Sequence, residues 1–370
     1  MKTCWCVLLV AGLILSSSAL FSGCAKNNTA AVDEMSPDVM LPKHFVAVKG
    51  LDECDFDPEG WPRYIMNCKD GSVMVMVPET IFVMGDTGRE VNEKPSHKVA
   101  VGRYYIDLYE VNNAQFARFA KAAGCIGPCC KKWKDDPVLA NGLLDTTTPE
   151  CWLKRNGDVA GMKCLKADPV RAPQAVQLDI SYFKEYWTPG VNDSHPARAV
   201  SYWEAWYYCR WVGKDLPTEA EWELAAKGPK PQMYPWGNIE PDSQHLLCNY
   251  DGSRPSEDGF HYTAPVTAFA AGRSPFGCYN MAGNVWEWCK DNYSATAYSV
   301  TNFAERTPFY ASEANRAFGD PTGPVYGDER VLRGGSYTSV IADCRTTNRE
   351  GCRPNFHGMN IGFRGVLRVR

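Results

Sequence analysis

Cysteine and histidine are the side chains most often used as nucleophiles and transition-metal ligands, and this chain has 16 cysteines and six histidines. The histidines are far apart, and beyond residue 23 only Cys125, Cys129 and Cys130 lie close together. No Cys-x-x-Cys pair and no zinc-type Cys/His spacing occurs. A phosphate-binding loop, a dinucleotide fingerprint and a nucleophile elbow are also missing. The cysteines and histidines therefore predict no catalytic centre by themselves.

Oxygen ligands are better placed around a tryptophan-rich turn. Asn280 and Glu287 offer side-chain oxygens, while Gly283 and Val285 offer main-chain carbonyls. Calcium prefers six to eight oxygen ligands, so this turn suits a hard cation. Burial of the tryptophans at 286 and 288 for packing alone is the alternative interpretation.

The elements that must position these residues can be anticipated from local patterns. The alternation of apolar residues over 71–85 predicts a hairpin, and 104–109 predicts a further strand. Residues 110–123 predict an amphipathic helix capped by Asn112 or Asn113.

Two capping boxes, Ser201-x-x-Glu204 and Thr218-x-x-Glu221, each predict the start of a further helix. Residues 124–193 contain prolines and cysteines without a sustained period, which indicates a loop-rich insertion. Beyond residue 228, glycine, proline and short apolar runs predict loops and short strands.

The amino-acid composition excludes two classes of protein, disordered chains and strongly basic nucleic-acid binders. The 370 residues include 12 Trp, 18 Tyr and 15 Phe, too many aromatic rings for a disordered chain. The net charge of −4 and the lack of a basic stripe exclude a strongly basic nucleic-acid binder, so we expect no nucleic-acid partner.

The N-terminal residues indicate export. Lys2 precedes an apolar run over 7–15 that is too short to span a bilayer. The following Leu20-Phe21-Ser22-Gly23-Cys24 resembles a bacterial lipobox. We therefore expect a lipoprotein signal peptide over 1–23, then an acylated Cys24 and a flexible tether to residue 45. An ordinary signal peptide cleaved at a small residue is the alternative.

Residue 25 is alanine, which favours outer-membrane sorting, so we expect a lipid-anchored protein of the bacterial outer membrane, at the cell surface. The anchor would be its contact with the membrane. Loss of residues 1–23 removes Cys4 and Cys6, which leaves fourteen of the 16 cysteines, and thirteen thiols once Cys24 is acylated. An odd number predicts a free thiol or an intermolecular bond, with no connectivity readable from the spacing.

From about residue 71 to the end, several segments together resemble the formylglycine-generating-enzyme (sulfatase-modifying-factor) family, a branch of the C-type-lectin-like folds. The segments are MVMVP (74–78), FVMG (82–85), EKPSH (93–97), YEVNN (109–113), RWVGKDLPTEAEWE (210–223), YPWGN (234–238), YNMAGNVWEW (279–288), RGGS (333–336) and GFR (362–364). LPTEAEWE and GNVWEW are the most specific of them. Glu79-Thr80 departs from the family's usual Gly-Gly, which alters only a turn.

The resemblance implies an α+β, loop-rich C-type-lectin-like fold with short strands and a few helices, over about residues 46–370. It also implies structural calcium. The first site would use Asn280, Gly283, Val285 and Glu287, and the second would use Asn249, Tyr250, Asp258 and Phe260.

Catalytic members of this family hold copper(I) between two cysteines that follow the Gly-Gly-Ser motif. The matching positions here are Ser339 and Cys344. Serine is a hard, neutral ligand that binds copper(I) poorly, so we expect neither copper nor enzymatic activity.

The C-terminal segment, residues 330–370, also resembles the variable region of diversity-generating-retroelement proteins, including treponemal variable lipoproteins of this domain type. Between 337 and 360, every residue except Glu350 and Met359 can arise from a codon ending in a pyrimidine, and Lys, Gln and Trp are missing. The mixture of aromatic and hydrogen-bonding residues is typical of adaptable binding loops. An ordinary, invariant family loop is the alternative.

On this interpretation, some residues of the segment form a scaffold and others contact a ligand. The scaffold would comprise Arg333, Ser336, Cys344, Arg345, Arg349 and Arg364. The candidate ligand contacts are Tyr337, Thr338, Ser339, Ile341, Asp343, Thr346, Asn348, Glu350, Asn355, Phe356, His357, Met359 and Asn360.

We therefore predict a monomeric, non-catalytic lipoprotein that binds a protein or glycan ligand through a diversified C-terminal face. Two alternatives remain, an exported copper-dependent oxidase of the formylglycine-generating type and an invariant structural lipoprotein of the envelope.

Overall fold

The structure is a computed structural model that describes residues 39–49, 51, 56–122, 181–241, 246–250, 259–299 and 318–369. The expected signal peptide, Cys24 and most of the expected insertion lie outside these residues. Within the described part of the chain, no helix combines the length and apolar character needed to cross a bilayer. The chain divides into two compact units at Gly71, and each is described by itself.

The first unit contains an antiparallel pair of strands. β1 (Phe45–Val48) pairs with β2 (Tyr64–Asn67), with Phe45 opposite Asn67. Its apolar side is small, and Phe45 and Ile65 are buried. Cys68, directly after β2, is disulfide-bonded.

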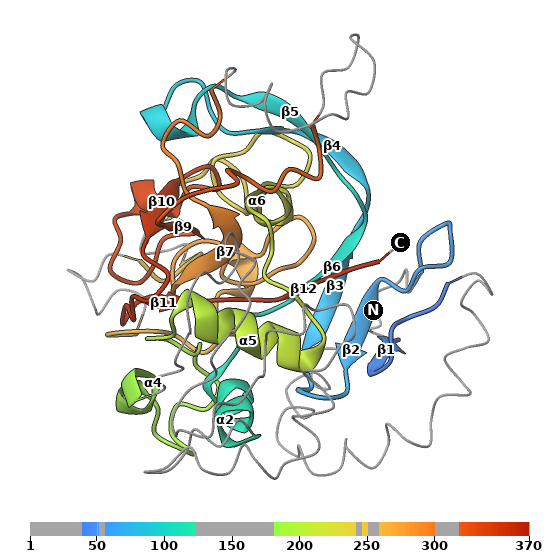
Figure 1. Ribbon diagram of the computed structural model, residues 1–370, viewed down its shortest axis with the longest axis vertical. Helices are drawn as coiled ribbons and strands as arrows, with labels where there is room; N and C mark the ends of the chain where they lie inside the picture. The colour runs from blue at the N-terminus through green and yellow to red at the C-terminus, as the bar shows by residue number, and fades with distance from the viewer. Residues whose placement is uncertain are drawn as a thin grey trace, which may run out of the picture. The chain divides into compact units, whose positions relative to one another are not determined.

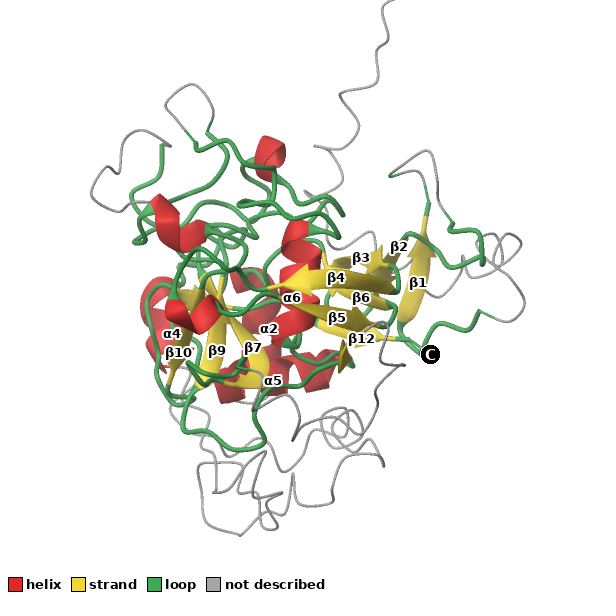
Figure 2. Ribbon diagram, turned by 90° about the horizontal axis from the view of Figure 1, so that it is seen from above, coloured by secondary structure: helices red, strands yellow, loops and turns green. Residues whose placement is uncertain are grey.

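The second unit, from Ser72 onward, contains three groups of short paired strands (Figures 1 and 2). In one group, β6 (Tyr104–Asp107) lies between β3 (Val73–Val77) and β12 (Val366–Arg368), antiparallel to both. In another, β5 (His97–Val101) pairs with β4 (Thr80–Met84) and β8 (Phe318–Gly319).

The third group forms the framework of the C-terminal segment. Its order is β10 (Arg349–Cys352), β9 (Arg330–Arg333), β7 (Trp286–Asn292) and β11 (Ile361–Gly362). β9 is antiparallel to β10 and β7, whereas β11 is parallel to β7.

The strands β3 and β4 correct one expectation from the sequence. Residues 71–85 do form two strands, but β3 pairs with β6 and β4 pairs with β5, so the predicted hairpin is wrong. Alternation of apolar residues defines which face of a strand is buried and not which strand lies beside it.

The helices agree with the capping patterns. α2 (Asn113–Ala122) is capped by Asn112, whose Oδ1 accepts from the amide of Gln115 at 2.9 Å. α5 (Tyr202–Val212) and α6 (Glu219–Lys227) each have the predicted capping box. α4 (Ser181–Tyr186) is short, and single 3₁₀ turns cover Val91–Glu93, Ala270–Gly272 and Ile341–Cys344.

The main core joins helices α2 and α5 to the framework strands. Phe116 of α2, Tyr208 of α5 and Phe363 are buried together, and their rings lie within 6.1 Å of one another. Trp288 and Leu332 belong to the same cluster. These elements confirm the expected α+β fold with short strands and few helices.

Candidate functional site

The C-terminal segment contributes three strands to the framework. It forms β9, returns as β10 and ends with the short strand β11, before β12 joins β6. Two loops, 334–348 and 353–360, are thereby held at their bases by paired strands (Figure 1). The sequence had predicted these loops as the ligand-binding region.

Two glycines make the first loop possible. Gly334 and Gly335 have φ values of 96° and 73°, in the left-handed region where side chains are strained. A Cβ atom on Gly335 would lie 2.7 Å from Sγ of Cys344. The Gly-Gly pair thus lets the chain turn tightly against the buried thiol.

Four buried arginines hold the segment against the rest of the fold. Arg349 donates to both oxygens of Glu219 at 2.7 Å, and Arg333 pairs with Glu223. Arg345 donates to both oxygens of Glu93 at 2.8 Å.

The fourth arginine, Arg364, donates to both oxygens of Glu287 at 2.6 and 2.7 Å. Paired guanidinium–carboxylate contacts of this kind restrict orientation as well as position. We call Arg333, Arg345, Arg349 and Arg364, with their carboxylates, the arginine frame. All four of these arginines, which the sequence assigned to the scaffold, are buried and ion-paired.

Several of the predicted contact residues do face solvent. The exposed side chains are Thr338, Glu350, Asn355, Phe356 and Met359. Phe356 and Met359, on one loop, are 55% and 49% exposed and provide apolar contact area at the surface. Ile341, Asp343, His357 and Asn360 are partly exposed. We call these nine residues the exposed face.

Four of the predicted contact residues are buried, which corrects their assignment to a ligand-binding surface. They are Tyr337, Ser339, Thr346 and Asn348. The Thr346 hydroxyl donates to the carbonyl of Gln232 at 2.9 Å, and Asn348 donates to the carbonyl of Asp343 at 2.8 Å. Thr346 thus ties the loop to the segment at Gln232, and Asn348 stabilises the loop from within.

His357 links the exposed face to helix α4. Its ring stacks on Tyr182 at 4.4 Å between centroids, and its Nε2 lies 3.1 Å from Oε2 of Glu204. Tyr182 is itself 44% exposed. Sequence reasoning missed this neighbour because α4 lies within residues 124–193, which were expected to form a loop-rich insertion.

At the first expected calcium site, the carboxylate of Glu287 is already engaged by other side chains. Both carboxylate oxygens of Glu287 accept from Arg364, and Oε2 also accepts from Nε1 of Trp222 at 2.8 Å. A guanidinium at this distance opposes a divalent cation. Asn280 keeps a buried Oδ1 that accepts no hydrogen bond from the described residues, and it is one potential ligand. The use of the Gly283 and Val285 carbonyls as further ligands stays a prediction.

The second expected calcium site lies only partly within the described residues, because Asp258 falls outside them. Asn249 uses its amide to donate to the carbonyl of Tyr262 at 2.7 Å. Within the described part of the chain, no cluster of three or more His, Cys, Asp or Glu side chains is arranged to hold a metal. The use of Tyr250 and Phe260 as ligands stays a prediction.

The donor set at the family's copper position does not suit copper(I). Cys344 is fully buried, and burial raises the pKa of its thiol well above the ordinary value, so the thiolate is disfavoured. Ser339 accepts from the amide of Ser336 at 3.1 Å. One protonated thiol and one hydroxyl provide no pair of soft anionic ligands.

Two buried carboxyls, Glu110 and Asp291 of β7, were not anticipated from the sequence. Burial, aided by the charge of Glu287, raises the pKa of Glu110 to about 8. Glu110 accepts from the amides of Asn280 and Asn284 at 2.8 and 2.9 Å. Burial and the nearby Glu219 likewise raise the pKa of Asp291 to about 7. Only the position of Glu110 inside a family motif could have drawn attention to it.

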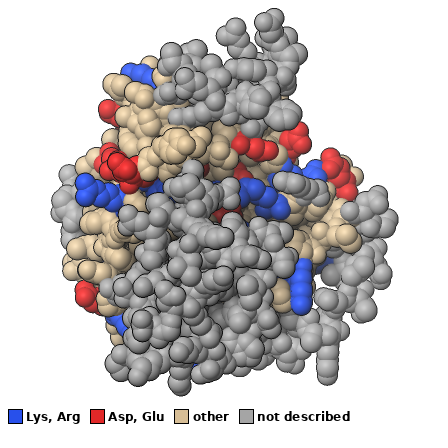
Figure 3. Space-filling view, in the orientation of Figure 1, with Lys and Arg blue, Asp and Glu red and all other residues tan. Residues whose placement is uncertain are grey.

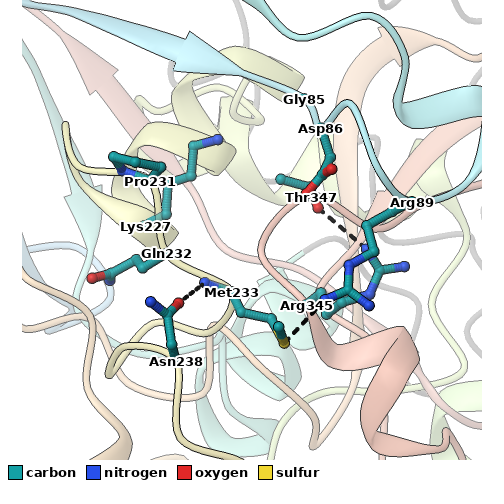
Figure 4. Close-up of a pocket in the computed structure, with 10 residues that line it drawn as sticks. All are labelled: Gly85, Asp86, Arg89, Lys227, Pro231, Gln232, Met233, Asn238, Arg345 and Thr347. Carbon is teal, nitrogen blue, oxygen red and sulfur yellow. Dashed lines mark hydrogen bonds between the residues drawn. The ribbon is translucent and has the colours of Figure 1, made fainter.

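A cavity of about 210 Å³ lies beside the base of the first loop (Figure 4). Arg345 and Thr347 line one side, and Met233 and Asn238 line the other. Its cations are largely neutralised, since Arg345 pairs with Glu93 and Lys227 pairs with Glu223. On the face drawn in Figure 3, acidic and basic side chains are interspersed among the described residues.

Comparison with known proteins places this geometry in context. Residues 65–369 match the model of the family described as Sulfatase-modifying factor enzyme 1-like domain. The formylglycine-generating enzyme of Thermomonospora curvata is 35% identical over 313 residues, covering 79% of this chain and 92% of that protein. The inactive C-alpha-formylglycine-generating enzyme 2 of Mus musculus is 29% identical, covering 82% and 88%.

Solved structures give the same fold at lower identity. PvdO from Pseudomonas aeruginosa aligns with a TM-score of 0.52 and 22% identity, covering 83% of this chain and 98% of that one. Treponema denticola variable protein 1 aligns with a TM-score of 0.50 and 19% identity, covering 80% and 95%. The relatives thus include proteins named as active enzymes, as inactive paralogues and as variable proteins.

Proposed function

This chain belongs to the sulfatase-modifying factor enzyme 1-like family, and from that premise we propose that it is a non-catalytic ligand-binding member. In this proposal it is a lipoprotein, attached through Cys24 to the bacterial outer membrane and displayed at the cell surface. The exposed face binds a protein or glycan ligand, and a retroelement diversifies the C-terminal segment that carries it. The protein acts as a monomer.

The observation that carries the proposal is the division of the C-terminal segment into a buried frame and an exposed face. The arginine frame is held by bidentate ion pairs, whereas Phe356 and Met359 stand in solvent on the loop before β11. A binding loop that tolerates sequence change needs a base whose geometry does not depend on the changing residues. This arrangement meets that requirement.

The side chains of the exposed face suit recognition. Aromatic rings provide large contact areas at a low cost in conformational entropy, and short polar groups such as Thr338 and Asn355 supply adaptable hydrogen bonds. The residue types between 337 and 360, which apart from Glu350 and Met359 can all arise from codons ending in a pyrimidine, are those that diversification would produce.

The absence of catalysis is supported by the donor set after the Gly-Gly-Ser motif. Ser339 and Cys344 together lack the two thiolates that copper(I) requires, and the thiol present is buried. The same position distinguishes the proposal from an exported oxidase, which would need copper(I) bound through Cys344.

The decisive experiment is deep sequencing of the codons for residues 330–370 in one population of the source bacterium, with a search for a nearby adenine-rich repeat. The proposal predicts substitutions concentrated at the exposed face, with Arg333, Cys344 and Arg364 unchanged. An invariant segment without a repeat would refute diversification. Stable partners co-purifying with that invariant chain would then favour the structural lipoprotein.

The enzymatic alternative has its own test. Purified full-length protein should bind no copper(I) in competition with a chelator and should not convert a cysteine-containing peptide. Copper binding that is lost in Cys344→Ser would contradict the non-catalytic assignment.

A further inference from the structure

An arginine outside the C-terminal segment sits among three tyrosines beside the exposed face. The Cζ atom of Arg198 lies 4.7 Å from the ring centroid of Tyr186, 5.5 Å from that of Tyr262 and 5.7 Å from that of Tyr337. Its Nη1 donates to the Tyr337 hydroxyl at 3.1 Å and to the carbonyl of Met359 at 3.3 Å. We call Tyr186, Arg198, Tyr262 and Tyr337 the tyrosine–arginine patch.

The positive charge of this patch is not neutralised by an ion pair. Every arginine of the arginine frame has a carboxylate partner, whereas Arg198 has none among the described residues. Its Nε and Nη2 make no hydrogen bond to those residues either. The guanidinium is therefore oriented by Tyr337 and Met359 on one side and keeps donors for an external group on the other.

The patch is accessible and continuous with the exposed face. Tyr262 is 61% exposed, and Tyr186 and Arg198 are partly exposed. Met359, whose carbonyl accepts from Arg198, belongs to the exposed face itself. Helix α4, which carries Tyr186, also supplies Tyr182 for the stack on His357 and lies next to the C-terminal segment in Figure 1.

We propose that the tyrosine–arginine patch is a constant anchor that binds a carboxylate side chain of a protein partner. The proposal rests on the proposed function, because it gives the exposed face a class of ligand. A planar guanidinium with free donors binds carboxylates through two parallel hydrogen bonds, and flanking rings exclude water from that contact. Tyr186, Arg198 and Tyr262 lie outside residues 330–370, so these three members stay the same when that segment varies, and the segment itself supplies only the buried Tyr337.

A protein fits this surface better than a glycan does. Tyrosine and arginine are the residues most enriched at energetic centres of protein interfaces. Phe356 and Met359 extend the patch with large apolar side chains, whose burial needs an apolar partner surface. The acidic group would set the position of the partner, and the exposed face would select among partners.

The test uses a random linear peptide library displayed on phage and panned against the full-length protein. Selected sequences should be enriched in Asp or Glu next to an apolar residue. Affinities of the selected synthetic peptides are then measured by fluorescence anisotropy for the wild type and for Arg198→Gln. A loss of about thirtyfold or more is expected, the effect of removing an interface hot spot.

Two variants control this measurement. Arg89→Gln removes an equal charge at the separate cavity and should leave the affinity within about twofold, as a surface charge away from the contact does. Tyr262→Ala, at a largely exposed side chain, should weaken binding without disturbing the fold. Circular dichroism spectra of all variants should match that of the wild type.

Three outcomes would overturn the anchor. The first is a set of selected peptides without acidic residues. The second is that Arg198→Gln binds the peptides with wild-type affinity whereas Phe356→Ala does not bind them. That result would leave the proposed function intact. The third is retention on a heparin column that depends on Arg198 with no acidic peptide selected, which would indicate a sulfated glycan. Indifference of peptide binding to both Arg198→Gln and Phe356→Ala would refute the proposed function as well.

Discussion

Replacing Arg364 with methionine should destabilise the fold by about 3–5 kcal/mol at neutral pH, the cost of leaving a buried carboxylate unpaired. Arg364 and Glu287 are both fully buried, and the guanidinium donates to both carboxylate oxygens at 2.6 and 2.7 Å. Methionine resembles the arginine stem in volume, so the change removes the charge and its hydrogen bonds without opening a large cavity.

The structure also predicts what remains after the change. Glu287 would keep one donor, Nε1 of Trp222, and the carbonyl of Tyr279 would lose its hydrogen bond from Arg364 at 2.7 Å. Loss of that second contact adds about 1 kcal/mol. Because Arg364 also lowers the pKa of Glu110, removing it leaves two neighbouring buried carboxyls without a cation. The destabilisation should therefore shrink as the pH falls and the carboxyls take up protons.

The assay is equilibrium unfolding in urea, followed by tryptophan fluorescence, which reports on the buried Trp222 and Trp288. Arg364→Met is compared with Glu287→Gln and with the double variant. Glutamine keeps an acceptor for Trp222 and carries no charge, so the double variant should be more stable than Arg364→Met alone. Arg353→Met, at an exposed arginine, serves as the control and should change stability by less than about 0.5 kcal/mol.

A loss below about 1 kcal/mol for Arg364→Met would refute this reasoning, since a buried carboxylate cannot lose its only cation so cheaply. Equal instability of Arg364→Met and the double variant would also refute it. That result would assign the loss to packing and not to an unpaired charge.

Three further predictions concern other parts of the same region. The folded-state pKa of Glu110 is about 8 against an ordinary 4.5, so wild-type stability should fall as the pH rises between these values, and Glu110→Gln should flatten that profile in urea unfolding at several pH values. Gly335→Ala should lower stability by about 2 kcal/mol or more, because φ is 73° and the new Cβ would meet Cys344; an unchanged melting temperature would contradict the tight turn. Phe356→Ala should leave the urea midpoint unchanged but abolish peptide binding. Thr346→Val should lower the free energy of unfolding by about 1 kcal/mol and leave peptide binding unchanged. The reverse pattern would make Thr346 the ligand contact and Phe356 the structural residue.

Local features of this chain were decided by the sequence. The capping boxes at Ser201 and Thr218 depend on residues three positions apart, and both helices begin where those residues predict. The strand predicted over 104–109 forms over Tyr104–Asp107, and the glycine pair at 334–335 is equally local. The long motifs, LPTEAEWE and GNVWEW above all, were sufficient to identify the fold because each encodes contacts that the family shares.

The partners of these elements were decided only by the tertiary structure. Strand β3 pairs with β6 and not with β4, since alternation specifies a buried face and leaves the neighbouring strand open. The sequence predicted Thr346 as a surface residue, but in the folded protein its hydroxyl donates to the carbonyl of Gln232. Residue type alone does not distinguish a polar group that faces solvent from one that the fold has satisfied internally.

The residue type of a charged group likewise does not reveal its partners or its ionisation state. Glu287 was assigned to calcium from the oxygens around it, yet its chemistry is determined by Arg364, which lies 77 positions along the chain. Glu110 acquires its raised pKa from burial beside Glu287 and from amides at 280 and 284. The tyrosines around Arg198, which are Tyr186, Tyr262 and Tyr337, come from three separate segments of the chain. The sequence determined which groups are present, but ionisation and ligand choice depend on distances of a few ångströms that only folding sets.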